Sequence, residues 1–257
     1  MLRHYIEYPA RRADDARDLE RYLDKVTVFL SHSKHDGDGE RIARDIRDWL
    51  HQNSGLSSFF DVLDIPAGTP FQEVLELHVK RSALVAVHTD SYSSREWCRR
   101  EIIQAKRCNV PMILVNCVRD VDQRCFPYMG NVPNVRLDPG KEVPNKAYRI
   151  ERVVGCLLDE VFKDFLWRCR IELEEVDSPD VLFMARPPEL ISLANIEQRL
   201  FENPESLPLA DPSTPLDVAD PVIVYPDPPL GAEEEQLFEE IMPRVRMRNL
   251  TRWLTEA

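Results

Sequence analysis

Short apolar segments alternate with amphipathic segments through the first two thirds of the chain. The segments between the apolar ones carry hydrophobic residues at helical spacing, as at Ile42, Ile46 and Leu50 in the helix expected at 38–52. The expected strands are VTVFLS, SSFFDV, ALVAVHT, PMILVNCV and NVRLD, at residues 26–31, 57–62, 83–89, 111–118 and 134–138. Strands that are apolar throughout and separated by helices are typical of a parallel sheet covered on both faces. The pattern therefore predicts an α/β fold.

The same spacing predicts further helices and sets the outer limits of this domain. Helices are expected at 70–81, 94–107 and 144–173. Residues 10–24 alternate acidic and basic side chains around a few apolar ones, which predicts a charged surface helix. We therefore divide this part of the chain into an N-terminal helical extension at 1–24 and an α/β domain at 25–173.

The pattern changes near Ser178. Twelve of the 20 prolines follow it, and the segment 201–221 is typical of a loop or linker. Apolar segments at 180–185 and 221–225 predict strands, and 232–242 predicts a helix. Residues 178–257 should form a small, proline-rich second α/β unit. Near its end, basic and apolar residues alternate as on one edge of a strand, which we favour over a phosphate site: Arg244, Val245, Arg246, Met247, Arg248, Leu250 and Arg252.

Composition narrows the possible partners. The 33 basic and 45 acidic residues give a formal net charge of −12, which argues against nucleic acid as the main partner. The six cysteines include no C-x-x-C pair, so the sequence gives no support for a zinc site and favours a reducing compartment. We find no stretch typical of a signal peptide or a membrane span. We therefore expect a cytoplasmic protein that does not bind membranes.

Three motifs in register resemble the Toll/interleukin-1 receptor (TIR) family. FLSHSKHD at 29–36 is similar to the end of the family's first strand, and DVLDIPAG at 61–68 to the loop after its second. SYSSREWCRRE at 91–101 matches the motif after the third strand, with Trp97 and Glu101 spaced as in bacterial TIR enzymes that cleave NAD. The resemblance covers about 145 residues. It implies a flavodoxin-like sheet with strand order 2-1-3-4-5.

That strand order would locate a binding site. In open α/β sheets, ligands bind where adjacent connections leave in opposite directions, outside the carboxyl ends of the strands. Here those ends are the segment 31–33 and the loop 89–96, which leads directly to Trp97. Motif and topology therefore indicate the same crevice.

The chemistry of NAD suits the side chains of Trp97 and Glu101. The two residues are four apart, so they lie on one stripe of the expected helix, where an indole could stack on a ring and a carboxylate could bind ribose. Cleavage of the nicotinamide–ribose bond passes through an oxocarbenium-like state, which an anion stabilises. Glu101 is thus the expected catalytic residue. The alternative is that Glu101 is a solvated helix residue and Trp97 is a packing residue.

Further candidates for binding substrate lie in the three loops. Hydroxyls of Ser31 and Ser33, with His32, could hold phosphate or ribose, but capping of the next helix is an equal alternative. A metal site at His32, His35, Asp36 and Asp38 is disfavoured, because these residues form a loop with no partner cluster elsewhere. The resemblance assigns substrate contacts also to Tyr92 and to the mobile loop that carries Asp61, Gly68 and Phe71. A purely structural Pro-Ala-Gly turn is the alternative for that loop.

We therefore expect an NAD glycohydrolase or ADP-ribosyl cyclase of the kind found in prokaryotic antiviral defence. NAD is its substrate, and no cofactor or metal is expected. The resemblance implies self-association through TIR domains, and a partner effector or sensor protein is compatible with it. The alternative is a non-catalytic TIR scaffold. Nucleic-acid cleavage or cyclic-nucleotide synthesis is disfavoured by the acidic charge.

Overall fold

The computed structural model describes residues 27–52, 82–140, 144–173, 181–189, 191 and 221–256. By its internal contacts the chain divides into two compact units, Met1–Phe165 and Leu166–Ala257. The expected N-terminal extension, the strand at 57–62 and the helix at 70–81 lie outside the described residues, as does almost all of the loop at 201–221.

The first unit contains a parallel four-stranded sheet in the order β1-β2-β3-β4. Its strands are β1 (Thr27–His32), β2 (Ser82–His88), β3 (Met112–Asn116) and β4 (Asn134–Arg136). They correspond to the first, third, fourth and fifth expected strands, so the α/β class and the order of these four strands are confirmed. The pairing is in register, with Phe29 opposite Leu84 and Leu84 opposite Met112.

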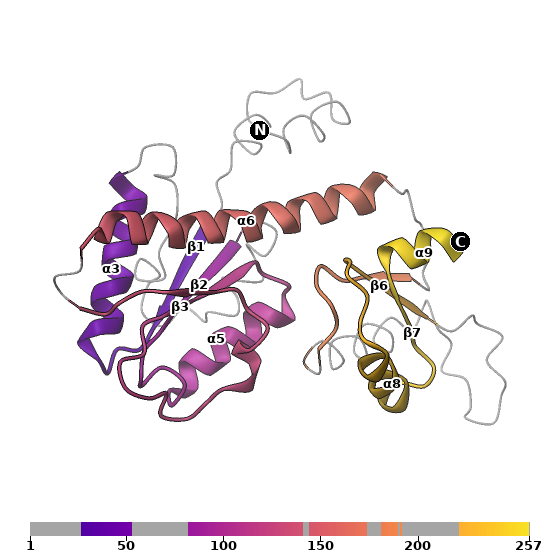
Figure 1. Ribbon diagram of the computed structural model, residues 1–257, viewed down its shortest axis with the longest axis horizontal. Coiled ribbons are helices and arrows are strands. Elements are labelled where there is room, and N and C mark those ends of the chain that lie inside the picture. The colour runs from indigo at the N-terminus through magenta and orange to yellow at the C-terminus, as the bar shows by residue number, and fades with distance from the viewer. Residues whose placement is uncertain are drawn as a thin grey trace, which may run out of the picture. The chain divides into compact units, whose positions relative to one another are not determined.

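Helices cover both faces of this sheet (Figure 1). Helices α3 (Gly37–Gln52) and α6 (Lys146–Leu173) pack on one face, and α5 (Glu96–Arg107) packs on the other. Alternate side chains of a strand point to opposite faces. Val28 and Leu30 therefore face α3 and α6, whereas Phe29 and Ser31 face α5.

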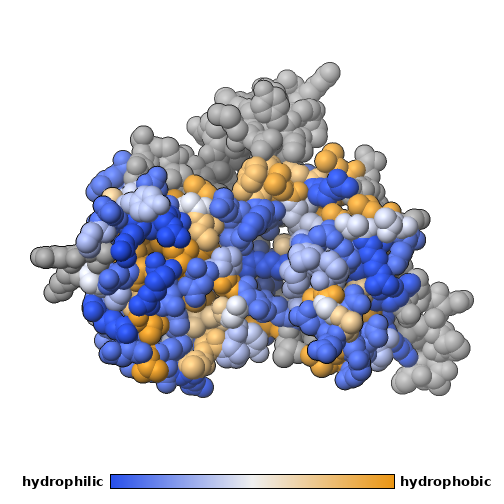
Figure 2. Space-filling model, in the orientation of Figure 1, coloured by the Kyte–Doolittle hydropathy of each residue, from blue (hydrophilic) through white to orange (hydrophobic). Residues whose placement is uncertain are grey.

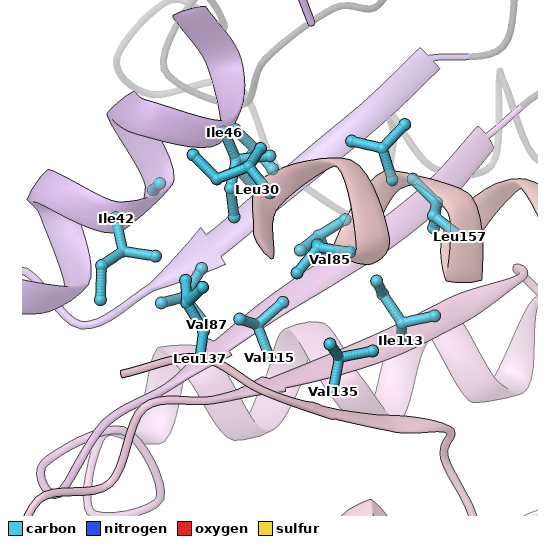
Figure 3. Close-up of a cluster of buried hydrophobic side chains, with 14 of the residues drawn as sticks. Leu30, Ile42, Ile46, Val85, Val87, Ile113, Val115, Val135, Leu137 and Leu157 are labelled. Carbon is cyan, nitrogen blue, oxygen red and sulfur yellow. The ribbon is translucent and has the colours of Figure 1, made fainter. Parts of the chain in front are cut away.

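The face under α3 and α6 is a continuous hydrophobic layer, which we call the α3/α6 core (Figure 3). Ile42 and Ile46 of α3 and Leu157 of α6 lie within it, and all three are buried. Residues of the four strands, and the residues directly after β3 and β4, complete it: Val28, Leu30, Ala83, Val85, Val87, Ile113, Val115, Cys117, Val135 and Leu137. Burial of this much aliphatic surface supplies the main stabilising term of the unit.

The face under α5 has a second hydrophobic layer, the α5 core. Cys98, Ile102 and Ala105 of α5 are buried against the sheet, as their i, i+4, i+7 spacing predicts. Phe29, Leu84, Ala86, Met112 and Leu114 meet them from the strands. The short 3₁₀ helix η3 (Pro127–Met129) closes this layer with Met129.

The second unit has its own parallel sheet, in the order β5-β6-β7. Strands β5 (Val181–Phe183) and β6 (Val222–Tyr225) and helix α8 (Ala232–Ile241) lie where the sequence predicts them. They are followed by β7 (Arg246–Asn249) and α9 (Leu250–Glu256). Tyr225 and Ile223 are fully buried at the centre of this small core.

The end of this unit corrects one prediction. The basic segment continues as a strand only to Asn249, and Leu250 and Arg252 belong to α9. The side chain of Asn249 donates a hydrogen bond to Asp227 at the strand end, and Thr251 donates another at 3.0 Å. Arg252 then pairs with Glu256 one helical turn later, at 2.7 Å. From Leu250 onward the chain therefore forms a helix with its own ion pair, where the sequence predicted the edge of a strand.

The described surface is mostly hydrophilic in the view of Figure 2. Some large apolar side chains of α6 are exposed, among them Phe162, Leu166 and Leu173. Within the described part of the chain, every helix is too short or too polar to span a lipid bilayer.

Candidate active site

Glu101 is a buried residue of α5. Its side chain lies on the sheet-facing side of the helix, next to Ile102, and the residue is only 4% exposed. An ionisable residue is seldom this buried without a specific partner. The alternative that Glu101 is a solvated helix residue is therefore wrong.

Trp97 lies one turn before Glu101 and is 55% exposed. The ring thus remains largely open to solvent, and the alternative of a packing residue does not fit. Trp97 lies close enough to the Glu101 carboxylate to lower its pKa. The four-residue spacing on one helix brings the exposed aromatic face and the buried anion side by side.

Ser31 and Tyr92 complete the surroundings of Glu101. The Ser31 hydroxyl, at the end of β1, donates a hydrogen bond to Oε2 of Glu101. Tyr92, in the loop after β2, places its hydroxyl 2.6 Å from Oγ of Ser31. Tyr92 and Ser31 are 0% and 2% exposed. The end of β1, the loop after β2 and helix α5 therefore meet through side chains at the carboxyl end of the sheet.

Burial changes the acidity of this group of residues. Desolvation raises the pKa of Glu101 from 4.5 to about 7, against hydrogen bonds from Ser31 and Trp97 and the positive charge of Lys34, which lower it. Desolvation also raises the pKa of Tyr92 well above its usual value, with smaller contributions from Cys98 and Glu101. Glu101 therefore changes its charge near neutral pH, while Tyr92 keeps its proton.

A second polar network lies beside this group, centred on Asp36. Its Oδ2 accepts hydrogen bonds from the hydroxyls of Thr89, at 2.7 Å, and Ser91. Its Oδ1 accepts the backbone N–H of Gly39 at 2.7 Å, which caps the start of α3. The hydroxyl oxygens of Ser91 and Ser33 lie 2.7 Å apart, and since Ser91 donates its one proton to Asp36, Ser33 is the donor between them. The network fixes the loop after β1 to the loop after β2.

Asp36 is the helix-capping residue that sequence reasoning missed. Capping was considered for Ser31 and Ser33, but the residue directly before a helix that starts at Gly37 is Asp36. The signal was available, since Asp is among the preferred N-cap residues. Asp38 lies two residues after Asp36, and its pKa is lowered because Arg119 and Arg41 donate hydrogen bonds to its carboxylate. Both carboxylates are thus engaged by the protein itself.

His32 lies at the last position of β1 and is partly exposed. Its backbone carbonyl accepts the Cys98 thiol at 3.6 Å, which ties β1 to α5. Its Nδ1 lies 3.4 Å from the carbonyl oxygen of Leu30. His32 and Ser33 directly follow Ser31, whose side chain contacts Glu101. The remaining candidates Asp61, Gly68 and Phe71 lie outside the described residues.

A buried cluster behind Tyr92 was not expected from the sequence. Nε2 of His88 lies 2.9 Å from Oδ2 of Asp122, which also accepts the Ser93 hydroxyl at 2.8 Å. The ring of His88 packs edge-on against Tyr92, with centroids 5.9 Å apart. Ser93 is fully buried and shares the same His88 nitrogen with Asp122, so this is not the arrangement of a Ser-His-Asp catalytic triad. The cluster contacts Tyr92 through the ring of His88.

Comparison with known proteins identifies the domain that carries these residues. Residues 28–147 match the family model of the TIR domain. The match includes Ser31, Tyr92, Trp97 and Glu101, together with all four strands of the first sheet from Val28 onward. The chain therefore contains a TIR domain over these residues. No curated protein matches it significantly.

Proposed function

We propose that this TIR domain cleaves the bond between nicotinamide and ribose in NAD, with Glu101 as the catalytic carboxylate. TIR domains can be NADases. The observation that carries the proposal is the contrast between Glu101 and Trp97: a buried, hydrogen-bonded carboxylate lies directly beside an exposed indole. Both lie at the carboxyl end of a parallel sheet, where such sheets bind ligands.

The chemistry requires little more than an anion. As the bond from C1′ of the ribose to the pyridinium nitrogen breaks, its electron pair neutralises nicotinamide and leaves positive charge on the sugar. A carboxylate held close to that carbon stabilises the transition state more than the ground state. Water then captures the sugar to give ADP-ribose, or a nucleophile of the same molecule captures it to give a cyclic product. Glu101 must be ionised, so activity should rise with pH through about 7.

The surrounding residues complete the proposed site. Trp97 stacks on a ring of the substrate, and the β1 end at Ser31, His32 and Ser33 lies near the ribose and phosphates. The loop with Asp61, Gly68 and Phe71 holds the remaining predicted substrate contacts, whereas Tyr92, also predicted as one, is fully buried and contacts Ser31 instead. TIR domains commonly self-associate, and we propose that assembly, with an effector or sensor partner, activates the enzyme in cytoplasmic antiviral defence.

The test is incubation of the purified full chain with NAD, with nicotinamide, ADP-ribose and cyclic products separated by chromatography and identified by mass spectrometry. Glu101→Gln should lower kcat by about a thousandfold or more, since it removes the charge but keeps the shape. Glu96→Gln makes the same change on an exposed residue of the same helix, so its activity should equal that of the wild type.

Equal turnover by the wild type and Glu101→Gln would exclude Glu101 from the reaction. A wild type that releases no nicotinamide at high protein concentration, yet self-associates, would favour the non-catalytic scaffold instead. Because TIR domains commonly self-associate, sedimentation of the same samples belongs in the experiment.

A further inference from the structure

The hydroxyls of Ser31 and Tyr92 form a directed chain that ends at Glu101. When Glu101 is ionised it can only accept, so the one proton of Ser31 is donated to its carboxylate. The Tyr92 hydroxyl lies 2.6 Å from the same Oγ, so Tyr92 must be the donor in that second hydrogen bond. The order of donation is therefore Tyr92 to Ser31 to Glu101, which extends across β1, the loop after β2 and α5.

We propose that Ser31 and Tyr92 are positioning residues that act in series, Tyr92 on Ser31 and Ser31 on Glu101, and hold the carboxylate ionised and aimed for catalysis. This rests on the proposed function for the catalytic part only, since the coupling between the three side chains exists whether or not NAD is the substrate. It assigns these two hydroxyls to Glu101 rather than to the substrate.

Burial is the first argument for this assignment. Tyr92 is 0% exposed and Ser31 2% exposed, so neither hydroxyl offers surface to a ligand. The rings of His88 and Tyr92 pack in a T-shaped arrangement, and Nε2 of His88 lies 2.9 Å from Asp122. A tyrosine held in this way donates its hydroxyl proton to Ser31 and not to a ligand.

Electrostatics is the second argument. Hydrogen bonds in a chain polarise one another, and in a buried site each donor to a carboxylate favours the ionised form. The other groups that act on Glu101 are Lys34 and Trp97, which lower its pKa. Cys98 has a pKa of about 12, raised mainly by burial, and stays neutral beside them. Because the pKa of Tyr92 is raised, this donor persists over the whole working pH range.

The experiment is a carboxyl titration of the full chain labelled with ¹³C in its glutamates, followed by NMR. The Glu101 signal is identified by its loss in Glu101→Gln. Ser31→Ala should move the Glu101 midpoint upward by about one pH unit, since it removes a hydrogen bond to a charged group. Tyr92→Phe should move it upward by less. In the double variant, Tyr92→Phe should add nothing to Ser31→Ala, because Tyr92 acts only through Ser31.

Kinetics provide the second measurement. Each variant should shift the acid limb of the NAD-cleavage profile upward by the same amount as its NMR midpoint. At neutral pH, Ser31→Ala should lower kcat about 10- to 100-fold with little change in KM. Ser94→Ala is the matched control: it removes a hydroxyl of the same loop that donates to the backbone carbonyl of Ser91 and not to Glu101, so the Glu101 midpoint should stay in place.

Additive midpoint shifts in the double variant would overturn the proposal, because they would mean that Tyr92 acts on Glu101 independently. A raised KM with an unmoved midpoint would likewise overturn it and make Ser31 or Tyr92 a substrate contact. If the wild type cleaves no NAD, the proposed function fails while the NMR titration still decides the coupling. Circular dichroism of each variant verifies that it is folded.

Discussion

The two faces of the TIR sheet are built from the same strands but differ at their carboxyl ends. On the α3/α6 face the layer stays aliphatic to the end of the strands, with Val87 and Val115 both fully buried. On the α5 face the equivalent end is polar, with Ser31 and His88 buried beside Tyr92 and Glu101. Since successive residues of a strand point to opposite faces, a shift of one residue separates the two environments.

One face of the sheet therefore stabilises the domain, whereas the other contains a group that lowers its stability. Aliphatic burial on the α3/α6 face is favourable without further conditions. The α5 face instead encloses a carboxylate whose charged form is disfavoured by desolvation. Buried groups that lower the stability of the fold are typical of active and binding sites. The substitutions below test this division of roles.

The largest effect on stability is expected from a cavity in the α3/α6 core. Ile46→Ala removes a fully buried side chain and should lower the free energy of unfolding by about 2–5 kcal/mol. Urea unfolding at several pH values measures it, and the loss should be equal at each pH because the pocket is uncharged. A change in the Glu101 titration midpoint in this variant would show that the two faces are coupled, contrary to our division.

A smaller effect of opposite sign is expected at Glu101. Its pKa is raised from 4.5 to about 7 in the folded protein, so folding favours the protonated form. The resulting stabilisation is complete below about pH 4.5 and is lost as the pH rises through about 7. Glu101→Gln stays neutral, and above pH 8 it should be more stable than the wild type by on the order of 2–3 kcal/mol.

The comparison is made by urea unfolding of the two proteins between pH 4.5 and 8.5. The advantage of Glu101→Gln should shrink towards the acid end, and Glu96→Gln, exposed and paired with Arg100, should differ from the wild type by less than about 0.5 kcal/mol throughout. A constant difference across this range would mean that Glu101 does not titrate near neutrality.

The smallest of the three effects is expected where the polar network supports the fold. Asp36→Ala removes the cap of α3 and the acceptor of the Thr89 and Ser91 hydroxyls, which should cost about 1–2 kcal/mol. Asp36→Asn keeps one acceptor and should retain part of that stability. Thermal unfolding of both variants provides the measurement, and an unchanged midpoint in Asp36→Ala would refute a structural role for the network.

Much of the fold was predictable because it depends on local periodicity. The strands of the first sheet, helices α3, α5 and α6, and the buried stripe of Cys98, Ile102 and Ala105 all follow from spacing along the chain. Trp97 and Glu101 became candidates for a different reason, because the motif that contains them resembles that of TIR enzymes that cleave NAD. The basic segment at the C-terminus was predicted less well, because alternation alone does not show where a strand ends and a helix begins.

The α/β pattern, the TIR motifs and the presence of a carboxylate on α5 all follow from the order of residues along the chain. The burial of that carboxylate, its contact with Ser31 from 70 residues earlier, and the contact of Tyr92 with Ser31 become visible only in the folded domain. The reason is physical. Periodicity reports which side of one helix or strand faces the interior, whereas the acidity and aim of a carboxylate depend on solvent exclusion and on donors that other elements bring to it.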